Sequence, residues 1–324
     1  MYSAAGDSNF DTVVSNGIPI MGGGGIPAMF GNVYFVDYRN GLEGNSGKKE
    51  EPLKTLGAAY AKCTSNNNDI ICIDGDSTVQ EDEAIAWSKN RIHVIGLGGG
   101  FLTGQRAKVQ LSTTGNAADT SCTLNVTGVG NSFHNLKVMN SGTHASSIAC
   151  LIDAGEANWY NNCSFMKFTD LDQTTVSDVE MRSDSTTYTN CELGFDTLVQ
   201  SVARPTLRIK ASGATRCKHL YMKDCTFVCS SSSADKAHIL IENNSSLAFN
   251  NLIINPIFAC ALVSSTSAAA LDDAINSAAG LVEGNILVVN PASNCTAVCA
   301  TVTDQIQVVG PLTHVNAGAP QTPA

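Results

Sequence analysis

The sequence predicts an all-β fold, a parallel β-helix in which short strands stack coil upon coil. A six-residue pattern occurs five times between Leu124 and Ile254: a bulky apolar residue, any residue, Asn or Asp, Leu or Cys, any residue, and a bulky apolar residue. A second apolar strand precedes the copies, and the segment shows no apolar period typical of a long helix. A repeat of fixed length in this range is typical of solenoids.

The fourth position of each copy is expected to point into the interior of the coils. In stacked parallel coils, like residues lie above like residues at strand spacing, about 4.8 Å apart. Buried thiols behave there as small apolar groups. The predicted interior ladder is Leu136, Cys163, Cys191, Cys225 and Leu252, separated by 27, 28, 34 and 27 residues.

The third position of each copy is expected to form a tight turn. Asn and Asp adopt the left-handed backbone region more readily than most residues. An Asn amide can also bond to the amide above it in the stack. We interpret this second ladder as structural; it consists of Asn135, Asn162, Asn190, Asp224 and Asn251.

The composition of the 324-residue chain agrees with a solenoid and excludes several function classes. Charged residues make up 15% of it, whereas ordinary domains carry about 25%. The net charge of −10 argues against a nucleic-acid partner. No apolar run reaches the roughly 18 residues of a membrane helix, and the start, Met1–Asp7, lacks the features of a signal peptide. We therefore expect no nucleic acid, no membrane and no export signal.

The twelve cysteines are expected to be mostly reduced. Three of them are ladder positions, and no Cys-x-x-Cys pair with nearby His ligands indicates a zinc site. No metal site and no cofactor is predicted.

Four parts of the chain follow from these patterns. Residues 1–30 form an extended arm and residues 31–66 a strand with a short helix that places Leu53, Leu56 and Tyr60 on one face. Residues 67–260 form the coils, and residues 261–324 a helix over Ser267–Ala279, a closing β-element and a tail. The arm is rich in Gly, and its apolar side chains are the predicted partner-binding residues: Ile18, Ile20, Met21, Ile26, Met29 and Phe30.

The segments Gly31–Gly41, Pro52–Ala61 and Ile92–Gly98 together resemble the opening of the pectate-lyase-like, right-handed parallel β-helix proteins. Such proteins are found in bacteriophage virions and among polysaccharide-degrading enzymes. The resemblance covers residues 31–100, and beyond them only the coil period continues it. It implies that the short helix caps the first coil and shields its open strand edges.

The resemblance, the arm and the absent export signal imply a structural protein of a tailed bacteriophage, assembled in the host cytoplasm and displayed on the surface of the virion. A capsid decoration (cement) protein is the first hypothesis, with the major capsid protein or another virion protein as the partner of the arm. The resemblance also implies a homotrimer. The alternatives are a tailspike that binds or cleaves host surface polysaccharide, and a non-catalytic fibre or adhesin.

No complete catalytic set is recognised, so the prediction is that the protein is not an enzyme and cleaves no glycan. Arg208–Lys210 matches a three-residue signature of polygalacturonases whose other motifs are missing. Asp170 and Asp172 lie close in sequence, as do Asp178 and Glu180. Strand alternation is expected to place Asp178 and Glu180 on the same outer face. A polysaccharide lyase or hydrolase is the alternative that would use these residues.

Overall fold

The computed structural model describes residues 31–310 with short gaps, together with three two-residue strands outside that range. Two of these strands, β1 (Val14–Ser15) and β2 (Ile18–Pro19), form an antiparallel pair within the predicted arm. The third is β28 (Thr313–His314). The gaps are residues 99, 101–103, 112–121, 143–146, 169–174, 202–203, 212–215, 233–235, 243–246, 249, 263–270, 272, 278–284, 296 and 300–305.

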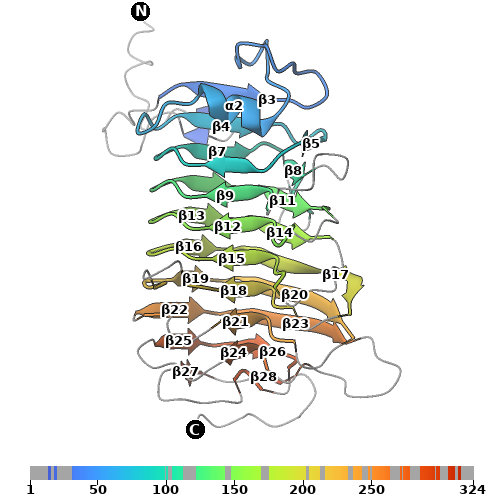
Figure 1. The fold of residues 1–324 in the computed structure, drawn as a ribbon, viewed down its shortest axis with the longest axis vertical. Coiled ribbons are helices and arrows are strands. Elements are labelled where there is room, and N and C mark those ends of the chain that lie inside the picture. Colours follow the sequence, from blue (N-terminus) through green and yellow to red (C-terminus); the bar gives the residue numbers. More distant parts are fainter. Residues whose placement is uncertain are drawn as a thin grey trace, which may run out of the picture.

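The described strands stack into three long parallel sheets of ten, nine and seven strands (Figure 1). A typical coil passes from the seven-stranded sheet to the ten-stranded sheet, then to the nine-stranded sheet, and returns to start the next coil. Neighbouring coils pair in parallel and in register, as where Leu151 lies opposite Leu124 on one side and Val179 on the other. The predicted parallel β-helix is confirmed.

The three sheets draw one strand each from successive coils. The ten-stranded sheet contains β3 (Val33–Val36), β4 (Ile70–Ile73), β7 (His93–Gly96), β10 (Ser132–His134), β13 (Trp159–Asn161), β16 (Thr187–Thr189), β19 (Tyr221–Lys223), β22 (Asn251–Ile254), β25 (Ile286–Val289) and β27 (Ile306–Val309). The nine-stranded sheet contains β5 (Thr78–Glu81), β8 (Lys108–Leu111), β11 (Lys137–Asn140), β14 (Ser164–Lys167), β17 (Glu192–Gln200), β20 (Thr226–Ser231), β23 (Ile257–Leu262), β26 (Ala292–Ser293) and β28. The seven-stranded sheet contains β6 (Ile85–Trp87), β9 (Leu124–Val126), β12 (Leu151–Asp153), β15 (Val179–Met181), β18 (Leu207–Ile209), β21 (Ile239–Ile241) and β24 (Ile275–Ser277).

A two-residue corner joins the ten-stranded sheet to the nine-stranded sheet in the regular coils. Its first residue is Asn or Asp with φ between 50° and 55°, the left-handed region expected from the repeat. The side-chain amide of Asn162 donates to Oδ1 of Asn135 at 2.9 Å, so the predicted contact between stacked amides is present. The corner residues with this backbone are Asn135, Asn162, Asn190, Asp224, Asn255 and Asn290.

The second corner residue points into the core, as predicted for Leu136, Cys163, Cys191 and Cys225, each of which is fully buried. Beside this ladder the interior of the ten-stranded sheet carries stacked rings, with Phe133 and Tyr188 on either side of Tyr160. All twelve cysteines are buried and none forms a disulfide.

The fifth copy of the repeat was assigned out of register. Strand β22 pairs with β19 so that Leu252 lies opposite Tyr221, and Asn255 therefore occupies the corner position after Asp224. Leu252 is half-buried on the outer face instead of inside the coil. Asn251 belongs to β22, where its side-chain oxygen accepts the backbone N–H of Leu220 at 3.1 Å. The corner residue Asn255 follows Asp224 by 31 positions, whereas the prediction placed Asn251 at the corner after 27.

The coils also continue past residue 260, where a helix over Ser267–Ala279 had been expected. In the described part of that stretch, Ile275–Ser277 forms strand β24, which pairs with β21. Leu271, Ala274 and Ile275 are buried in the core. Their spacing suits a helix as well as a coil corner followed by a strand, and parallel pairing with the preceding coil decides between the two.

The N-terminal end of the core is covered by helix α2 (Leu56–Lys62), as predicted (Figure 1). Thr55 caps the helix by accepting the N–H of Ala58, and Leu56, Ala59 and Tyr60 are its buried residues. The carboxylate of Glu81 accepts the N–H of Leu56 at 2.7 Å and that of Gly57 at 3.2 Å. These bonds satisfy helix N–H groups that have no partner within the helix.

The Glu81 carboxyl is expected to make the stability of the folded protein depend on pH. Burial raises its pKa to about 7 although both helix N–H bonds lower it. The folded state therefore holds this proton more tightly than the unfolded state, and the stabilisation present below the usual carboxyl pKa is lost as the pH rises through 7. Glu81→Gln should make this decline shallower, as measured by urea unfolding of both proteins between pH 4 and pH 8. An equally steep decline in the variant would contradict the assignment.

Candidate functional site

The outer face of the seven-stranded sheet carries charged side chains in two parallel rows. Glu180 and Arg208 are the central residues of β15 and β18, lie opposite each other in register, and point away from the core. The second row follows the ends of successive strands and consists of Arg182, Lys210 and Glu242. Because strand neighbours in a parallel sheet lie about 4.8 Å apart, five charged groups from three coils share one small area. We call these five residues the charged cluster.

The charged cluster is held together by ion pairs within and between coils. Glu180 pairs with Arg182 of its own coil, two residues along. Arg208 lies 3.6 Å from one carboxylate oxygen of Glu242, and Lys210 lies 3.4 Å from the other. The register of β15, β18 and β21 therefore positions both carboxylates against cations.

Burial differs sharply within the charged cluster. The side chains of Glu180 and Arg208 are 2% and 5% exposed, whereas that of Lys210 is 41% exposed. Removing a charged group from water is costly unless other charges compensate. Burial lowers the pKa of the Arg208 guanidinium, while Glu242 and Glu180 oppose that shift. A buried ion-paired guanidinium on an outer sheet face is the kind of group that marks a functional site.

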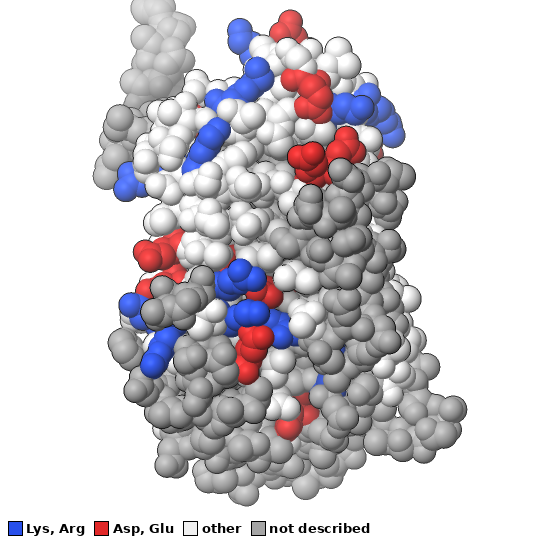
Figure 2. All heavy atoms as spheres, in the orientation of Figure 1, with Lys and Arg blue, Asp and Glu red and all other residues white. Residues whose placement is uncertain are grey.

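The charged cluster has three basic and two acidic groups, so it carries a net positive charge in a chain whose total is −10. Figure 2 shows basic and acidic side chains gathered at mid-height, on the face where β15, β18 and β21 lie in Figure 1. Such an arrangement attracts an anionic ligand, and Arg and Lys are the side chains that bind carboxylates.

Asp178 and Glu180 do not form the carboxylate pair that alternation predicted. Strand β15 begins at Val179, so Asp178 belongs to the preceding corner and turns inward, where it is fully buried. Its Oδ1 accepts the backbone N–H of Lys167 at 2.7 Å. Only Glu180 faces outward, and the prediction that both share an outer face is wrong.

The other predicted site residues are divided between the described and undescribed parts of the chain. Asp170 and Asp172 lie outside the described residues. Ile18 belongs to β2, whose side chains are not described. The remaining arm residues also lie outside the described part; they are Ile20, Met21, Ile26, Met29 and Phe30.

Arg182 and Glu242 were missed in the sequence. The signal that would have found them is the stacking of Glu180-Met181-Arg182 on Arg208-Ile209-Lys210 and on Leu240-Ile241-Glu242. In each triplet an inward apolar residue separates two outward positions.

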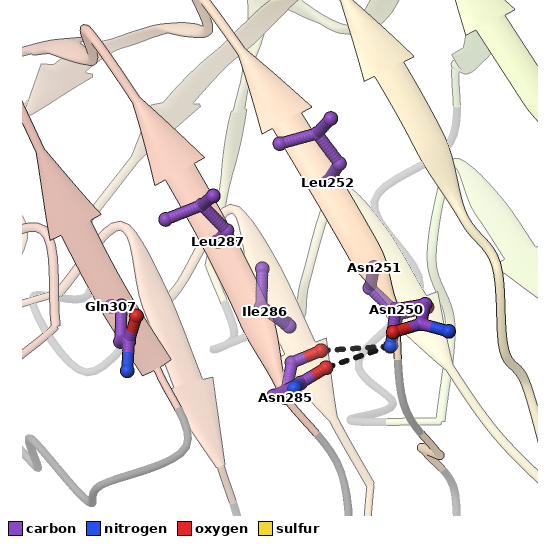
Figure 3. A pocket seen from close by; sticks show the side chains of 7 residues that line it. All are labelled: Asn250, Asn251, Leu252, Asn285, Ile286, Leu287 and Gln307. Carbon is purple, nitrogen blue, oxygen red and sulfur yellow. Dashed lines mark hydrogen bonds between the residues drawn. The ribbon is translucent and has the colours of Figure 1, made fainter.

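A hollow of about 400 Å³ lies elsewhere, on the outer face of the ten-stranded sheet (Figure 3). Leu252 of β22 and Leu287 of β25 lie side by side along it, with Gln307 of β27 beyond them. Oδ1 of Asn285 accepts the backbone N–H of Asn250 at 2.7 Å. None of its lining residues is acidic or basic, so it offers no group for acid–base chemistry, and the charged cluster is the stronger candidate site.

Within the described ranges, no group of three or more His, Cys, Asp and Glu side chains is placed to hold a metal ion. No helix in that part of the chain has the length and apolar character needed to cross a membrane.

Comparison with solved structures identifies the fold. A pectin methylesterase from Aspergillus niger matches with a TM-score of 0.54 at 14% identity, over 90% of this chain and 87% of that one. The pectate lyase Pel9A matches with a TM-score of 0.54 at 14% identity, over 90% and 79% of the two chains. A GH136 lacto-N-biosidase from Eubacterium ramulus matches with a TM-score of 0.52 at 12% identity, over 85% and 58%. No protein-family model and no curated protein matches the sequence.

These likenesses show that the chain has the pectate-lyase-like β-helix fold, the fold of β-helix proteins that act on polysaccharides. They also correct the prediction that the protein is not an enzyme. The structures that share its fold are enzymes by name, namely a methylesterase, a lyase and a biosidase. The missing polygalacturonase motifs were therefore a poor guide, because this fold serves several chemistries.

Nothing in the comparisons links the chain to a virion. The capsid location, the contact of the arm with the major capsid protein and the homotrimer stay predictions.

Proposed function

We propose that the protein binds an acidic polysaccharide across the outer face of the seven-stranded sheet, at the charged cluster. The observation that carries this proposal is the buried Arg208 on that face, ion-paired at 3.6 Å to Glu242 and flanked by Glu180. A uronate or other carboxylated sugar matches the fork of a guanidinium and the charge of Lys210 and Arg182. The fold of polysaccharide-acting proteins supports the same ligand class.

The side chains of the charged cluster are expected to have different roles in ligand binding, depending on how buried each one is. Arg208 is fixed by its neighbours and holds Glu242 in place, whereas the more exposed Lys210 can move toward the ligand. Glu180 and Glu242 provide the two carboxyl groups that glycoside hydrolysis commonly needs. The experiment that tests binding should therefore also test whether the bound polysaccharide is cleaved.

The test is a titration of polygalacturonate and of an uncharged glucan into the wild-type protein at low salt. Binding should be confined to the acidic polymer and should weaken as salt is added, because salt screens exposed charges. Equal affinity for the uncharged glucan would contradict the proposal. Appearance of reducing ends or unsaturated products during incubation would show that the site also cleaves.

Substitutions at the charged cluster are expected to weaken binding of the acidic polysaccharide. Arg208→Ala and Lys210→Ala should each raise the Kd for the acidic polymer, Arg208→Ala by about tenfold or more, equivalent to ~1.4 kcal/mol. Arg39→Ala is the matched control, since its side chain is 63% exposed and pairs with Asp76. An effect of Arg39→Ala as large as that of Lys210→Ala would place binding elsewhere.

A further inference from the structure

A second set of polar side chains lies inside the protein, near the corner where the nine-stranded sheet leads back to the seven-stranded sheet. Its members interact with one another, and each is at most 1% exposed: Lys167, Asp178, Gln200, Arg204 and Lys236. The surrounding core is largely apolar, so these groups are costly to bury and call for a specific explanation.

Within this set, Gln200 and Lys236 are in direct contact. Gln200 ends β17, and its backbone carbonyl accepts the N–H of Ser232 in the next coil at 3.0 Å. This bond holds Gln200 against Ser232, four positions before Lys236 in the sequence. The Nζ atom of Lys236 contacts Oε1 of Gln200, which places the amine next to the carboxamide carbon Cδ. Among the described atoms, Nε2 of Gln200 has no hydrogen-bond partner.

The surroundings favour a reactive amine. Burial lowers the pKa of Lys236, and Arg204 lowers it further, against the opposing charges of Cys229 and Asp178. A neutral lysine amine is a nucleophile, whereas an ammonium is not. Burial also raises the pKa of Asp178, while the charges of Arg204 and Lys236 oppose that shift.

We propose that Lys236 and Gln200 join spontaneously in an isopeptide cross-link. Nζ forms a bond to Cδ, the bond between Cδ and Nε2 breaks, and Nε2 leaves as ammonia with the proton that Nζ loses. The products are one secondary amide and one ammonia, so the step needs no oxidant, reductant or further reactant.

The cross-link ties two successive coils together at a corner. It closes a loop between residues 200 and 236 in a chain whose cysteines form no disulfide. Like a disulfide, it restricts the unfolded chain more than the folded one and therefore stabilises the fold. The reaction does not depend on the polysaccharide or on the charged cluster.

The test is the intact mass of the full-length wild-type protein, measured after denaturation and reduction. We expect a mass lower than that calculated from the sequence by one ammonia. Proteolysis should then yield a branched peptide that joins Gln200 to Lys236. This peptide distinguishes the cross-link from cyclisation of an asparagine, which also releases one ammonia. A wild-type protein at its full calculated mass, or a loss located at an asparagine, would overturn the proposal.

Two variants locate the reacting amine. Lys236→Arg keeps a long basic side chain but has no reactive amine, and it should show the full calculated mass. Lys210→Arg makes the same change on the outer face, where the side chain is 41% exposed, and should retain the loss. A Lys236→Arg protein that still lacks one ammonia would refute the assignment. The branched peptide of the wild type decides the question even if that variant fails to fold.

Discussion

Replacing Cys191 by Asp is expected to lower the free energy of unfolding by about 3–5 kcal/mol, the cost of an uncompensated buried charge. Cys191 is fully buried between Cys163 and Cys225, and burial raises the pKa of its thiol far above the usual value. Its Sγ donates to the carbonyl oxygen of Tyr160 at 3.4 Å. A carboxylate in this ladder would face the carbonyl oxygens of Tyr160 and Thr189, which repel it.

The matched control is the preceding residue, Asn190. It is exposed and has φ of 52°, a conformation that Asp also adopts readily. Asn190→Asp should therefore cost less than about 1 kcal/mol, as surface substitutions usually do. Urea unfolding of both variants at pH 7 gives the comparison. Losses of similar size would mean that the inward and outward positions of the corner are assigned wrongly.

The stacked corner explains why so much of this fold could be predicted from the sequence. An Asn or Asp at φ near 50° followed by an inward Leu or Cys recurs because every coil meets the same two constraints, a sharp turn and a filled core. The fifth copy failed because Asn250-Asn251-Leu252 imitates the pattern. Asn250 also has positive φ, at 63°, but lies at the other end of β22. The preference of Asn for positive φ does not tell which end of a strand a corner occupies when the coil length changes.

The candidate site could be predicted only in part. Arg208 and Lys210 were noticed through a short motif, whereas Arg182 and Glu242 have no motif and become neighbours only through inter-coil register. Asp178 was misplaced because alternation holds only inside a strand, and β15 starts one residue later. The connections between coils vary in length and have no sequence period. Whether a residue in a connection, such as Asp178, points inward or outward therefore cannot be predicted from the sequence.

The fold and the chemistry of this protein are separate questions. Parallel stacking needs only the apolar ladder, the corner residues and the strand register, all of which lie in the core or at the corners. Charged side chains on the outer face are not needed for stacking and are costly to remove from water, so the buried side chains of Glu180 and Arg208 are the feature that our proposed ligand would explain. The same reasoning does not apply to buried acids that accept several hydrogen bonds, and Asp153 is the clearest of these.

Asp153→Ala is expected to destabilise the protein by about 3–5 kcal/mol, since it removes the acceptor from several buried donors at once. Asp153 is fully buried at the end of β12 and accepts bonds from Asn158 at 3.2 Å, Ser183 at 3.0 Å and Tyr188 at 3.3 Å. Burial raises its pKa to about 6 against the opposing effect of these bonds. The group therefore remains a charged acceptor in a substantial fraction of molecules at neutral pH.

The comparison that isolates this effect is Asp76→Ala. The Asp76 carboxylate is 51% exposed and pairs with Arg39 at the surface, where such pairs contribute about 1 kcal/mol or less. Thermal and urea unfolding of both variants at pH 7 should separate them by several kcal/mol. Asp153→Asn keeps one acceptor oxygen and should fall between Asp153→Ala and the wild type. If Asp153→Ala unfolds at the same urea concentration as Asp76→Ala, the hydrogen-bonded centre at this corner does not hold the coils together.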